Sequence, residues 1–578
     1  MKSHRRVLMA CLLAAALTPG LEAQGRAGSR PAQTGPQPQE QAPDDFFIDT
    51  VNVSVVNVDV YVTDKKGNRI NGLTRDDFEL FENGKPMAIT NFYAVEEGKA
   101  VSAPAPEPAP EAPAAGPALP TLDQVETPED QRLRLVVYID NFNIAPFNRN
   151  RVMRELRVFL NQKLGRDDTV MLVSYDRSLK VRHNFTGDPD LIASALVGLE
   201  KHTGAAVHQE SDRKQAIRNI QDSQSVGEAK MYARAYAEAA YNDLQFTIGA
   251  LKETVDALAG LPGRKAVLYV SDGLPMTAGQ DVFYAVQNKY GTDGASMMDS
   301  FSYDASRRYT ELAAQANANR VSFYTIDAAG LRTYSSISAE NSAPMEGAVM
   351  IDSIQISNMQ SPLQLLAEKT GGMAVLNSNV VMPQLERIAQ DFNTYYSLGY
   401  SPTHFGDGRY HRIEVKVKGR KGLVVRHRDG YRDKPVESRM NDATLATLHF
   451  PFEENPLGID VNFGQVTQRE DGLFLVPVNV RIPLGKVTLV PREATNEARV
   501  RLFLAAMDSG GDTSEVQQQL VPISIPNADV AAAMDKYYVY SVSLLMRGGE
   551  HKVGVGVRDD VAGEASYLSR GVRVGPRG

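Results

Sequence analysis

The middle of the chain alternates between two hydrophobic patterns. Mostly apolar runs, typical of buried strands, occupy residues 133–139, 170–175, 266–270 and 321–326. Between the first two runs, apolar residues recur every four positions: Val152, Leu156, Leu160 and Leu164. This spacing indicates an amphipathic helix. Because strands alternate with helices over this length, we expect residues 131–400 to form an α/β domain with a doubly wound, mostly parallel sheet of the Rossmann type.

The expected strands of this domain end in acidic residues. Asp140 and Asp327 close two of the apolar runs, and Ser271-Asp272-Gly273 closes a third. In open parallel sheets, ligands bind outside the carboxyl ends of the strands. We therefore expect the ligand face of the domain at these aspartates.

A helical insertion is expected just before the third apolar run. Apolar residues with alternating four- and three-residue spacing mark a helix from Leu244 to Leu258. The preceding residues, about 204–243, are polar and alanine-rich. They either extend this helix or form an exposed excursion near the ligand face.

Two flanking regions have the two-residue period of strands. In residues 44–98, Val51, Val53 and Val55 alternate with polar residues, and Asn83-Gly84 is a hairpin signal. Residues 437–578 contain runs spaced like the strands of a sandwich. We expect a small N-terminal β-module, a closing β-hairpin extension at 401–436, and a C-terminal β-sandwich-like domain.

The first residues have the features of a signal peptide, expected over 1–23. Lys2, Arg5 and Arg6 precede an apolar segment at 7–17, and a cleavage site is expected before Gln24. An uncleaved anchor is the alternative. Cys11 is the only cysteine, and too few apolar residues precede it for a lipoprotein signal. The chain is therefore expected in the periplasm or outside the cell, with no membrane span after cleavage and no disulfide.

Two linkers separate the expected domains. Residues 24–43 are rich in Gly, Gln and Pro, and residues 99–130 contain a Pro/Ala tract. The first is expected to be disordered, and the tract should form an extended spacer.

Composition narrows the class of protein. The chain has 578 residues, which is too long for a single core, and its hydrophobic fraction of 43% is that of globular proteins. The net charge of −8 argues against a nucleic-acid partner, because phosphate recognition needs a basic surface.

The pattern of strands and aspartates resembles a von Willebrand factor A (VWA) domain. Four further segments are similar to the VWFA-related family of secreted proteins predicted in acidobacteria: 72–78 (GLTRDDF), 82–84 (ENG), 398–402 (LGYSP) and 428–431 (RDGY). The resemblance covers about residues 45–435. It implies an α/β domain that binds partners, and the family has no established activity.

VWA domains often hold a cation at a metal-ion-dependent adhesion site. Its pattern is Asp-x-Ser-x-Ser, a Thr on a second loop and an Asp after a later strand. The resemblance matches Asp140 and Asp272 to the two aspartates and offers Thr203 as the threonine. Asn141 and Asn143 are carbonyl donors at other offsets.

The two serine positions depart from that pattern. They hold Phe142 and Ile144, whose side chains contain no oxygen. Thr186 looks instead like a residue that caps a helix start. A site for Mg²⁺, Mn²⁺ or Ca²⁺ remains one outcome, but the loss of two hydroxyl ligands favours a degenerate site with structural aspartates.

No pattern of catalytic residues is found, so we expect no enzyme. The nine histidines show no metal-ligand spacing, and nucleophile elbows and phosphate-binding glycine loops are absent from the sequence. His411 and His427 lie in a basic hairpin. That hairpin is either a charged edge or a surface for an anionic partner.

We therefore expect an exported binding protein. Its α/β domain would present the strand-end face to a protein or surface polymer, in protein–protein interaction or adhesion. The alternative is a structural or assembly scaffold of the envelope in which the β-modules make the contacts. A hydrolase is the third and weaker alternative.

Overall fold

The computed structural model describes most of the chain. It covers residues 55–96, 99–101, 132–163, 168–201, 206–291, 297–332, 347–450 and 454–575. The expected signal peptide, the first linker and most of the second lie outside these residues. The chain divides into two compact units, of which one spans Ser54–Ala446 and the other includes Thr447–Gly578. Within the described ranges, no helix is long and apolar enough to span a membrane.

A six-stranded mixed sheet lies at the centre of the first unit, in the order β11-β10-β9-β6-β7-β8. Its strands are β6 (Leu133–Asp140), β7 (Thr169–Tyr175), β8 (Leu179–Thr186), β9 (Arg264–Ser271), β10 (Val321–Asp327) and β11 (Ala374–Val375). All neighbours pair in parallel except β8, which is antiparallel to β7. The sequence analysis missed β8 because this edge strand is polar and mostly exposed or half-buried.

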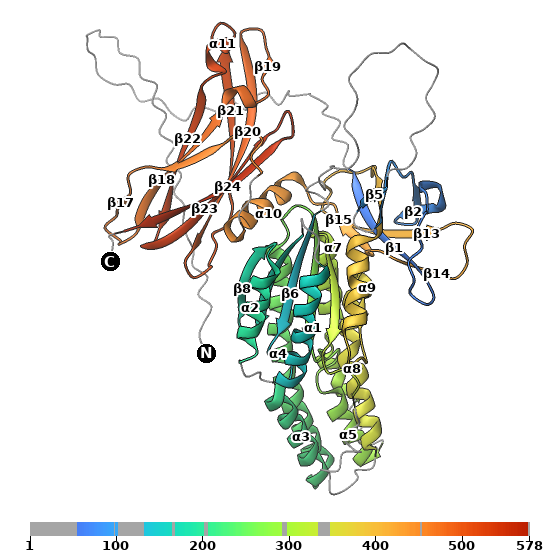
Figure 1. Cartoon of the computed structure of the whole chain (residues 1–578). Coiled ribbons are helices and arrows are strands. Elements are labelled where there is room, and N and C mark those ends of the chain that lie inside the picture. Colours follow the sequence, from blue (N-terminus) through green and yellow to red (C-terminus); the bar gives the residue numbers. More distant parts are fainter. Residues whose placement is uncertain are drawn as a thin grey trace, which may run out of the picture. The chain divides into compact units, whose positions relative to one another are not determined.

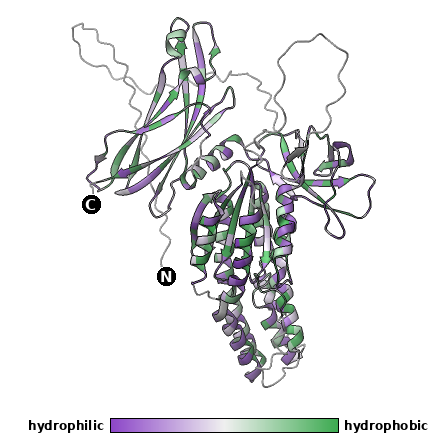
Figure 2. Ribbon diagram, in the orientation of Figure 1, coloured by the Kyte–Doolittle hydropathy of each residue, from purple (hydrophilic) through white to green (hydrophobic). Residues whose placement is uncertain are grey.

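Helices cover both faces of the sheet, as the strand–helix alternation predicts. One core joins the strands to the apolar stripes of α1 (Pro146–Lys163), α2 (Pro189–Leu199) and α9 (Met382–Asn393). The other face is covered by α4 (Val226–Ala257), α7 (Ser306–Ala318) and α8 (Ala348–Lys369). In Figure 2 the central strands are mostly green (hydrophobic), and the helices around them carry both colours.

A helical extension projects beyond the carboxyl ends of the strands (Figure 1). It contains α3 (Ala206–Asp222), α5 (Gln280–Tyr290), α6 (Met297–Ser300), η5 (Phe301–Tyr303) and the adjoining parts of α4 and α8. These helices share a core of their own. The region 204–243 thus both extends the long helix, through the first half of α4, and adds a separate helix, α3.

Small residues allow α4 to pack closely in this extension. Ser225 caps its start by accepting a hydrogen bond from the Glu228 amide at 3.2 Å. Ala229, Ala233 and Ala237 then form a fully buried stripe. A Cβ on Gly279 would lie 2.8 Å from the Cβ of Ala237, so glycine is required where α5 begins.

The β-module is built from two distant parts of the sequence. One sheet has the order β14-β1-β12-β4-β5, and the other has the order β15-β13-β2-β3. Residues 55–101 supply β1 (Val56–Asp64), η1 (Arg75–Asp77), β2 (Phe78–Glu82), β3 (Lys85–Met87), β4 (Asn91–Glu96) and β5 (Lys99–Val101). Residues 395–432 supply β12 (Tyr395–Tyr400), β13 (Tyr410–Val417), β14 (Leu423–Arg426) and β15 (Gly430–Arg432).

This pairing corrects the expected domain boundaries. Residues 44–98 do not form a separate module, because β1 lies between β12 and β14 and β2 pairs with β13. The alternating valines of β1 are buried in one core with residues of β12 and β13. The α/β domain is therefore inserted into a β-module, between β5 and β12.

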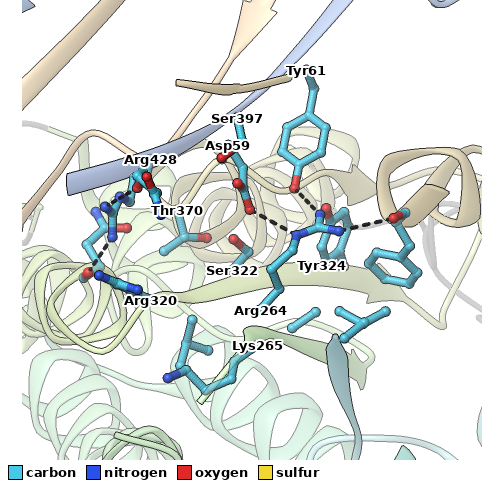
Figure 3. A pocket seen from close by; sticks show the side chains of 18 residues that line it. Asp59, Tyr61, Arg264, Lys265, Arg320, Ser322, Tyr324, Thr370, Ser397 and Arg428 are labelled. Atoms are coloured by element: carbon cyan, nitrogen blue, oxygen red, sulfur yellow. Dashed lines mark hydrogen bonds and ion pairs between the residues drawn. The ribbon is translucent and has the colours of Figure 1, made fainter. Parts of the chain in front are cut away.

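A polar junction joins the β-module to the amino ends of the parallel strands (Figure 3). At the start of β9, Arg264 donates to Asp59 Oδ2 at 2.9 Å and to the Tyr61 hydroxyl at 3.1 Å. It also donates to the carbonyl of Phe392 at 3.0 Å and lies 3.7 Å from the centre of the Tyr395 ring. One buried cation thus connects β9, β1 and α9.

The second unit is a β-sandwich. One sheet contains β16 (Asp460–Phe463), β17 (Thr467–Gln468), β18 (Phe474–Pro483) and β22 (Tyr537–Met546). The other contains β19 (Val490–Pro491), β20 (Thr495–Asp508), β21 (Gln517–Pro526), β23 (Gly549–Asp559) and β24 (Ala565–Val574). Two short helices, η7 (Leu484–Lys486) and α11 (Val530–Ala533), lie in connections. Both sheets contribute alternate residues to one core.

The region expected to be all-β from residue 437 begins with a helix. This is α10 (Val436–His449), which the sequence analysis did not predict. The boundary between the two units falls within this helix, after Ala446.

Candidate functional site

The strand-end face brings three aspartates to one edge of the sheet. Asp140 ends β6, Asp327 ends the parallel strand β10, and Asp272 directly follows β9 between them. Asp140 and Asp327 are fully buried. The sequence analysis placed these residues at strand ends, and the structure has them there.

The carboxylate of Asp140 is occupied by donors of the chain itself. Asn143 donates its amide N–H to Oδ1 at 3.1 Å and its side-chain N–H to Oδ2 at 2.9 Å. The hydroxyl of Tyr269 also donates to Oδ2. Burial raises the pKa of Asp140 to about 6, although these hydrogen bonds act in the opposite direction.

The two positions that would carry serine hydroxyls belong to the core. Phe142 has 1% of its surface exposed and packs edge-on against Tyr175. Ile144 is completely buried among the residues of the sheet and α1. Neither side chain contains an oxygen that could bind a cation. The degenerate-site hypothesis requires this absence of ligands.

Asp272 differs from Asp140 in having an unused oxygen. Its Oδ2 accepts from the Ala145 amide at 2.7 Å and from Asn148 at 3.0 Å. Its Oδ1 is buried and has no hydrogen-bond partner among the described residues. Burial is the main cause that raises the pKa of Asp272 to about 6.

Arg332 bridges the ends of two strands. It donates to Asp327 Oδ1 at 3.0 Å and to the carbonyl of Asp272. Gln360 on α8 donates to the other oxygen of Asp327 at 2.7 Å. Asp327 is thus held between a cation and an amide.

The other predicted ligands do not all lie beside Asp140. Asn141 does not join Asp140, because its side-chain oxygen accepts from the buried Arg149. Asn143 lies beside Asp140 and also donates to Thr247 on α4 at 3.1 Å. Thr203 lies outside the described residues. Thr186 does not cap α2, since Asp188 accepts the hydrogen bond from the first turn.

A cavity of about 660 Å³ lies over this face, at the base of the helical extension. It is lined by Asn143, Ala145, Glu210, Asp212, Arg213, Lys214, Ala239, Ala240, Asp243, Leu244, Asp272, Asp281, Arg332 and Met359, among others. Carboxylates outnumber basic side chains in this lining, five to three. Most of these charges are paired: Arg213 with Asp281 at 2.6 Å and Glu210 at 3.3 Å, and Asp243 with Arg177 at 3.3 Å. Asp212 and Asp272 form no ion pair among the described residues, so the cavity keeps an excess of negative charge beside apolar side chains such as Leu244 and Met359.

The sequence analysis missed several residues of this site. Tyr269 lies three positions before Asp272 and reads as one more residue of a buried strand. Asn148 is in the first turn of α1, where a polar residue is expected in any helix. Arg332 follows the strand end by five residues, and only the structure shows that it folds back.

The basic residues of the hairpin are divided between the interior and the surface. Arg426 is paired with the buried Asp391 at 2.7 Å, and Arg428 donates to the carbonyl of Asn57 at 2.7 Å. His411 is only 6% exposed. Arg412, Lys418, Arg420 and Lys421 are exposed, so the charged edge and the surface for an anionic partner both stay predictions.

Comparisons with known proteins were made for sequence and structure. No family model and no curated protein sequence matches the chain. Similar solved structures include an aerotolerance-related membrane protein from Bacteroides fragilis, with 12% identity, 46% of this chain and 98% of that chain covered, and a TM-score of 0.21.

Of two further similar structures, one is named as a von Willebrand factor type A protein and the other is loaded with manganese. A von Willebrand factor type A protein from Catenulispora acidiphila is 10% identical, with 77% of this chain and 66% of that chain covered and a TM-score of 0.19. Manganese-loaded TRAP protein from Plasmodium vivax is 10% identical, with 52% and 95% covered and a TM-score of 0.23. TM-scores this low support no conclusion about the site. Its function is therefore inferred from the residues of this chain.

Proposed function

We propose that the chain is an exported binding protein that holds a protein or surface polymer in the cavity at the strand ends. The observation that carries this proposal is the buried, unpartnered Oδ1 of Asp272 beside that cavity. A buried carboxylate oxygen without a hydrogen bond costs free energy, so a ligand donor that reaches it as the surrounding side chains move would recover part of that cost. No reaction is proposed, and the chain is taken as a binding module rather than an enzyme.

The chemistry of the cavity favours a cationic side chain of the partner. Asp272 and Asp212, which form no ion pair among the described residues, would attract an ammonium or guanidinium group. Leu244 and Met359 would pack against the aliphatic stem of a lysine or arginine. Such a contact needs the free oxygen of Asp272 and no metal.

Metal independence is the second part of the proposal. Asp140 is fully buried and both of its oxygens accept hydrogen bonds, from Asn143 and Tyr269. Phe142 and Ile144 are core residues. Mg²⁺ demands near-octahedral oxygen ligands. The adhesion site is therefore proposed to be degenerate, with its first aspartate acting as a loop-shaping group.

A photo-crosslinking experiment tests the site. A photoreactive residue is placed at Asp212, on the cavity, and separately at Val539, which is 51% exposed on the edge strand β22 of the second unit. Crosslinked species are collected from cells that export the full chain. We expect specific adducts from the cavity position, and we expect them to persist with a chelator present.

Two matched tryptophan substitutions complete the test. Ala240→Trp fills the cavity, whereas Ala235→Trp adds the same bulk to an exposed position of α4 that does not line it. The first should abolish the cavity adducts, and the second should leave them. Adducts from Val539 alone would instead support the scaffold alternative, and loss of cavity adducts in chelator would show a metal-dependent site.

A further inference from the structure

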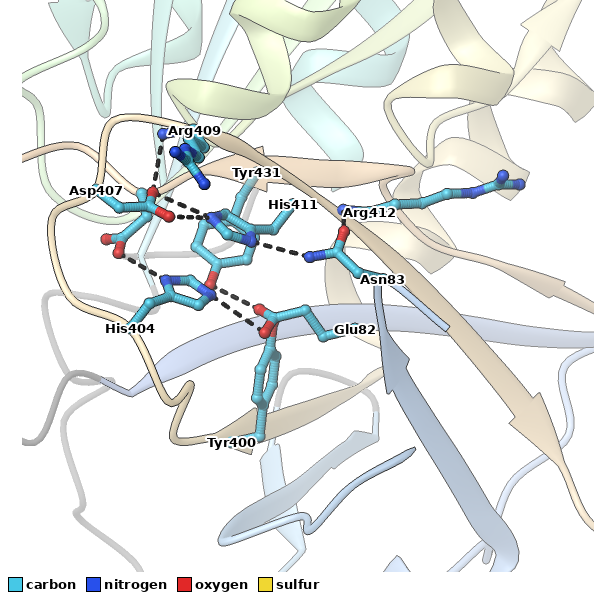
Figure 4. Close-up of polar contacts among 10 residues, drawn as sticks. Glu82, Asn83, Tyr400, His404, Asp407, Arg409, His411, Arg412 and Tyr431 are labelled. Atoms are coloured by element: carbon cyan, nitrogen blue, oxygen red, sulfur yellow. Dashed lines mark hydrogen bonds and ion pairs between the residues drawn. The ribbon is translucent and has the colours of Figure 1, made fainter. Parts of the chain in front are cut away.

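A cluster of histidines and carboxylates lies in the β-module, away from the strand-end face (Figure 4). Glu82 ends β2, His411 lies in β13, and Asp433 follows β15. His404 and Asp407 come from the connection between β12 and β13. The imidazole rings of His404 and His411 are stacked, with centres 3.7 Å apart and planes inclined by 12°.

Glu82 is one of two carboxylates that contact His404. Glu82 Oε1 accepts from the hydroxyls of Tyr400 at 2.7 Å and Tyr431 at 2.9 Å. Its Oε2 lies 3.2 Å from Nε2 of His404. A neutral imidazole has a single N–H, so it can donate to only one of the two carboxylates. In the tautomer that donates to Glu82, Nε2 carries the hydrogen and Nδ1 is left with its lone pair.

That lone pair faces a second carboxylate. Nδ1 of His404 lies 2.9 Å from Oδ2 of Asp433. A lone pair and a carboxylate oxygen repel each other unless a proton or a metal ion lies between them. The contact therefore needs a positive charge between the two atoms, supplied either by a proton or by a metal ion.

The orientation of His411 leaves Asp407 available beside this contact. The Arg412 amide donates to Asn83 Oδ1 at 2.9 Å, so Nδ2 of Asn83 is the donor to Nδ1 of His411, at 3.0 Å. His411 then carries its hydrogen on Nε2 and donates to both oxygens of Asp407 at 3.1 Å. This arrangement positions Asp407 but leaves further lone pairs on it.

Three ligand atoms already lie close enough to share an ion. Those of His404, Asp407 and Asp433 are all within 4.8 Å of one another. Two ligands of a tetrahedral zinc ion are separated by about 3.3 Å, from bonds of about 2.0–2.1 Å. The 2.9 Å between His404 and Asp433 would have to widen by only a few tenths of an ångström. Asp407, with 28% of its side chain exposed, opens the site to solvent.

We propose that His404, Asp407 and Asp433 bind a divalent transition-metal ion, with zinc preferred, and that water completes the coordination. The imidazole ligand selects such an ion over Mg²⁺ or Ca²⁺. Glu82 accepts the hydrogen on the far nitrogen of His404, which is the usual orienting partner of a metal-bound histidine. His411 is not a ligand, because the lone pair on its Nδ1 accepts a hydrogen bond from Asn83 and its Nε2 donates to Asp407.

The metal ion has a structural consequence. Glu82 belongs to the segment before the α/β domain, whereas the three ligands belong to the segment after it. An ion held by His404 would clasp the connection 401–409 against the end of β15, and Glu82 would link that clasp to β2. The site is independent of the strand-end cavity.

Zinc and cobalt binding to the full chain test this proposal. After chelator treatment and dialysis, ZnCl₂ is titrated by calorimetry at neutral pH, and CoCl₂ is followed by its visible absorption. We expect one ion per chain, and a cobalt spectrum of the intense type that a four-coordinate ion gives. His404→Gln and Asp433→Asn should each weaken binding by about 100-fold or more, and Glu82→Gln by about 10- to 100-fold.

Controls separate loss of a ligand from loss of the fold. His183→Gln lies on β8, outside the cluster, and should bind zinc as the wild type does. On the wild type alone, zinc should protect His404 from acylation by diethyl pyrocarbonate, read by mass spectrometry. The absence of zinc binding, binding unchanged in His404→Gln, or no protection of His404 would each overturn the proposal and leave a proton between His404 and Asp433.

Discussion

The substitution Asp272→Asn tests whether the strand-end face holds a buried and uncompensated carboxylate. The ordinary pKa of this group is 3.8, and burial, the largest cause, raises the pKa of Asp272 to about 6. The difference, 6 − 3.8, is about 2 pH units, and each unit corresponds to about 1.4 kcal/mol. The ionised carboxylate therefore costs the folded state about 3 kcal/mol at neutral pH.

The sign of the pH dependence follows from linkage. The folded chain holds the proton of Asp272 up to about pH 6, whereas the unfolded chain releases it near pH 3.8. The tighter binding of this proton by the folded state stabilises the fold fully below pH 3.8, and the stabilisation is lost as the pH rises through about 6. Because asparagine does not ionise, Asp272→Asn should escape that loss.

Urea unfolding at several pH values measures the effect. The helical far-ultraviolet signal reports mainly on the unit Ser54–Ala446, which contains the long helices of the described chain. Relative to Asp272→Asn, the wild type should lose about 3 kcal/mol between about pH 4 and pH 7.5. Asp222→Asn, an exposed change at the end of α3, should follow the wild type.

Two results would refute this reasoning in different ways. If the free energies of unfolding of wild type and Asp272→Asn changed equally with pH, the folded state would not hold Asp272 with a raised pKa. If added Mg²⁺ removed the difference, a cation would be compensating the carboxylate, and the degenerate-site proposal would be wrong.

Three further outcomes are expected. Mild proteolysis should cut between Ala100 and Thr121. The two pieces should nevertheless co-elute on gel filtration and separate only in denaturant, because β1 is paired with β12 and β14. Release of the N-terminal piece without denaturant would contradict that pairing. N-terminal sequencing of exported protein should begin near Gln24, and material that retains Met1 would argue for an anchor. Arg264→Met should cost about 1–3 kcal/mol in urea unfolding, since it leaves the Tyr61 hydroxyl, the Phe392 carbonyl and the partly exposed Asp59 without this donor, and an unchanged free energy of unfolding would show that those contacts contribute little.

The α/β part of the fold could be predicted because most of its parallel strands are predominantly apolar runs. Such runs are long enough to show their ends, so the positions of Asp140, Asp272 and Asp327 followed from the sequence. β8 was missed because an edge strand does not need an apolar face in the core. The composition of 204–243 predicted an insertion, but only the Ala229–Ala233–Ala237 stripe shows how its helices pack.

The β-module and the histidine cluster show what local patterns cannot give. The alternation in β1 predicts a strand, but its partners lie more than 300 residues away, and no local pattern selects them. The histidines were read as having no metal-ligand spacing. The order His404, Asp407, His411 was the available signal, yet it gains meaning only when pairing of β13 with β2 and β15 brings in Glu82 and Asp433.

The insertion of the α/β domain between β5 and β12 has a mechanical consequence. The chain enters the first unit through β1 and leaves it through α10, which follows β15. A pulling force applied between residues before β1 and the second unit is therefore carried by the hydrogen bonds of β1 with β12 and β14. The α/β domain contacts this path through Gly260, beside Asp442 of α10, and through Arg264 at the amino end of β9. The strand-end cavity, at the carboxyl ends of the strands, lies outside this line of force. A ligand in that cavity would remain bound under tension until the β-module itself is sheared apart.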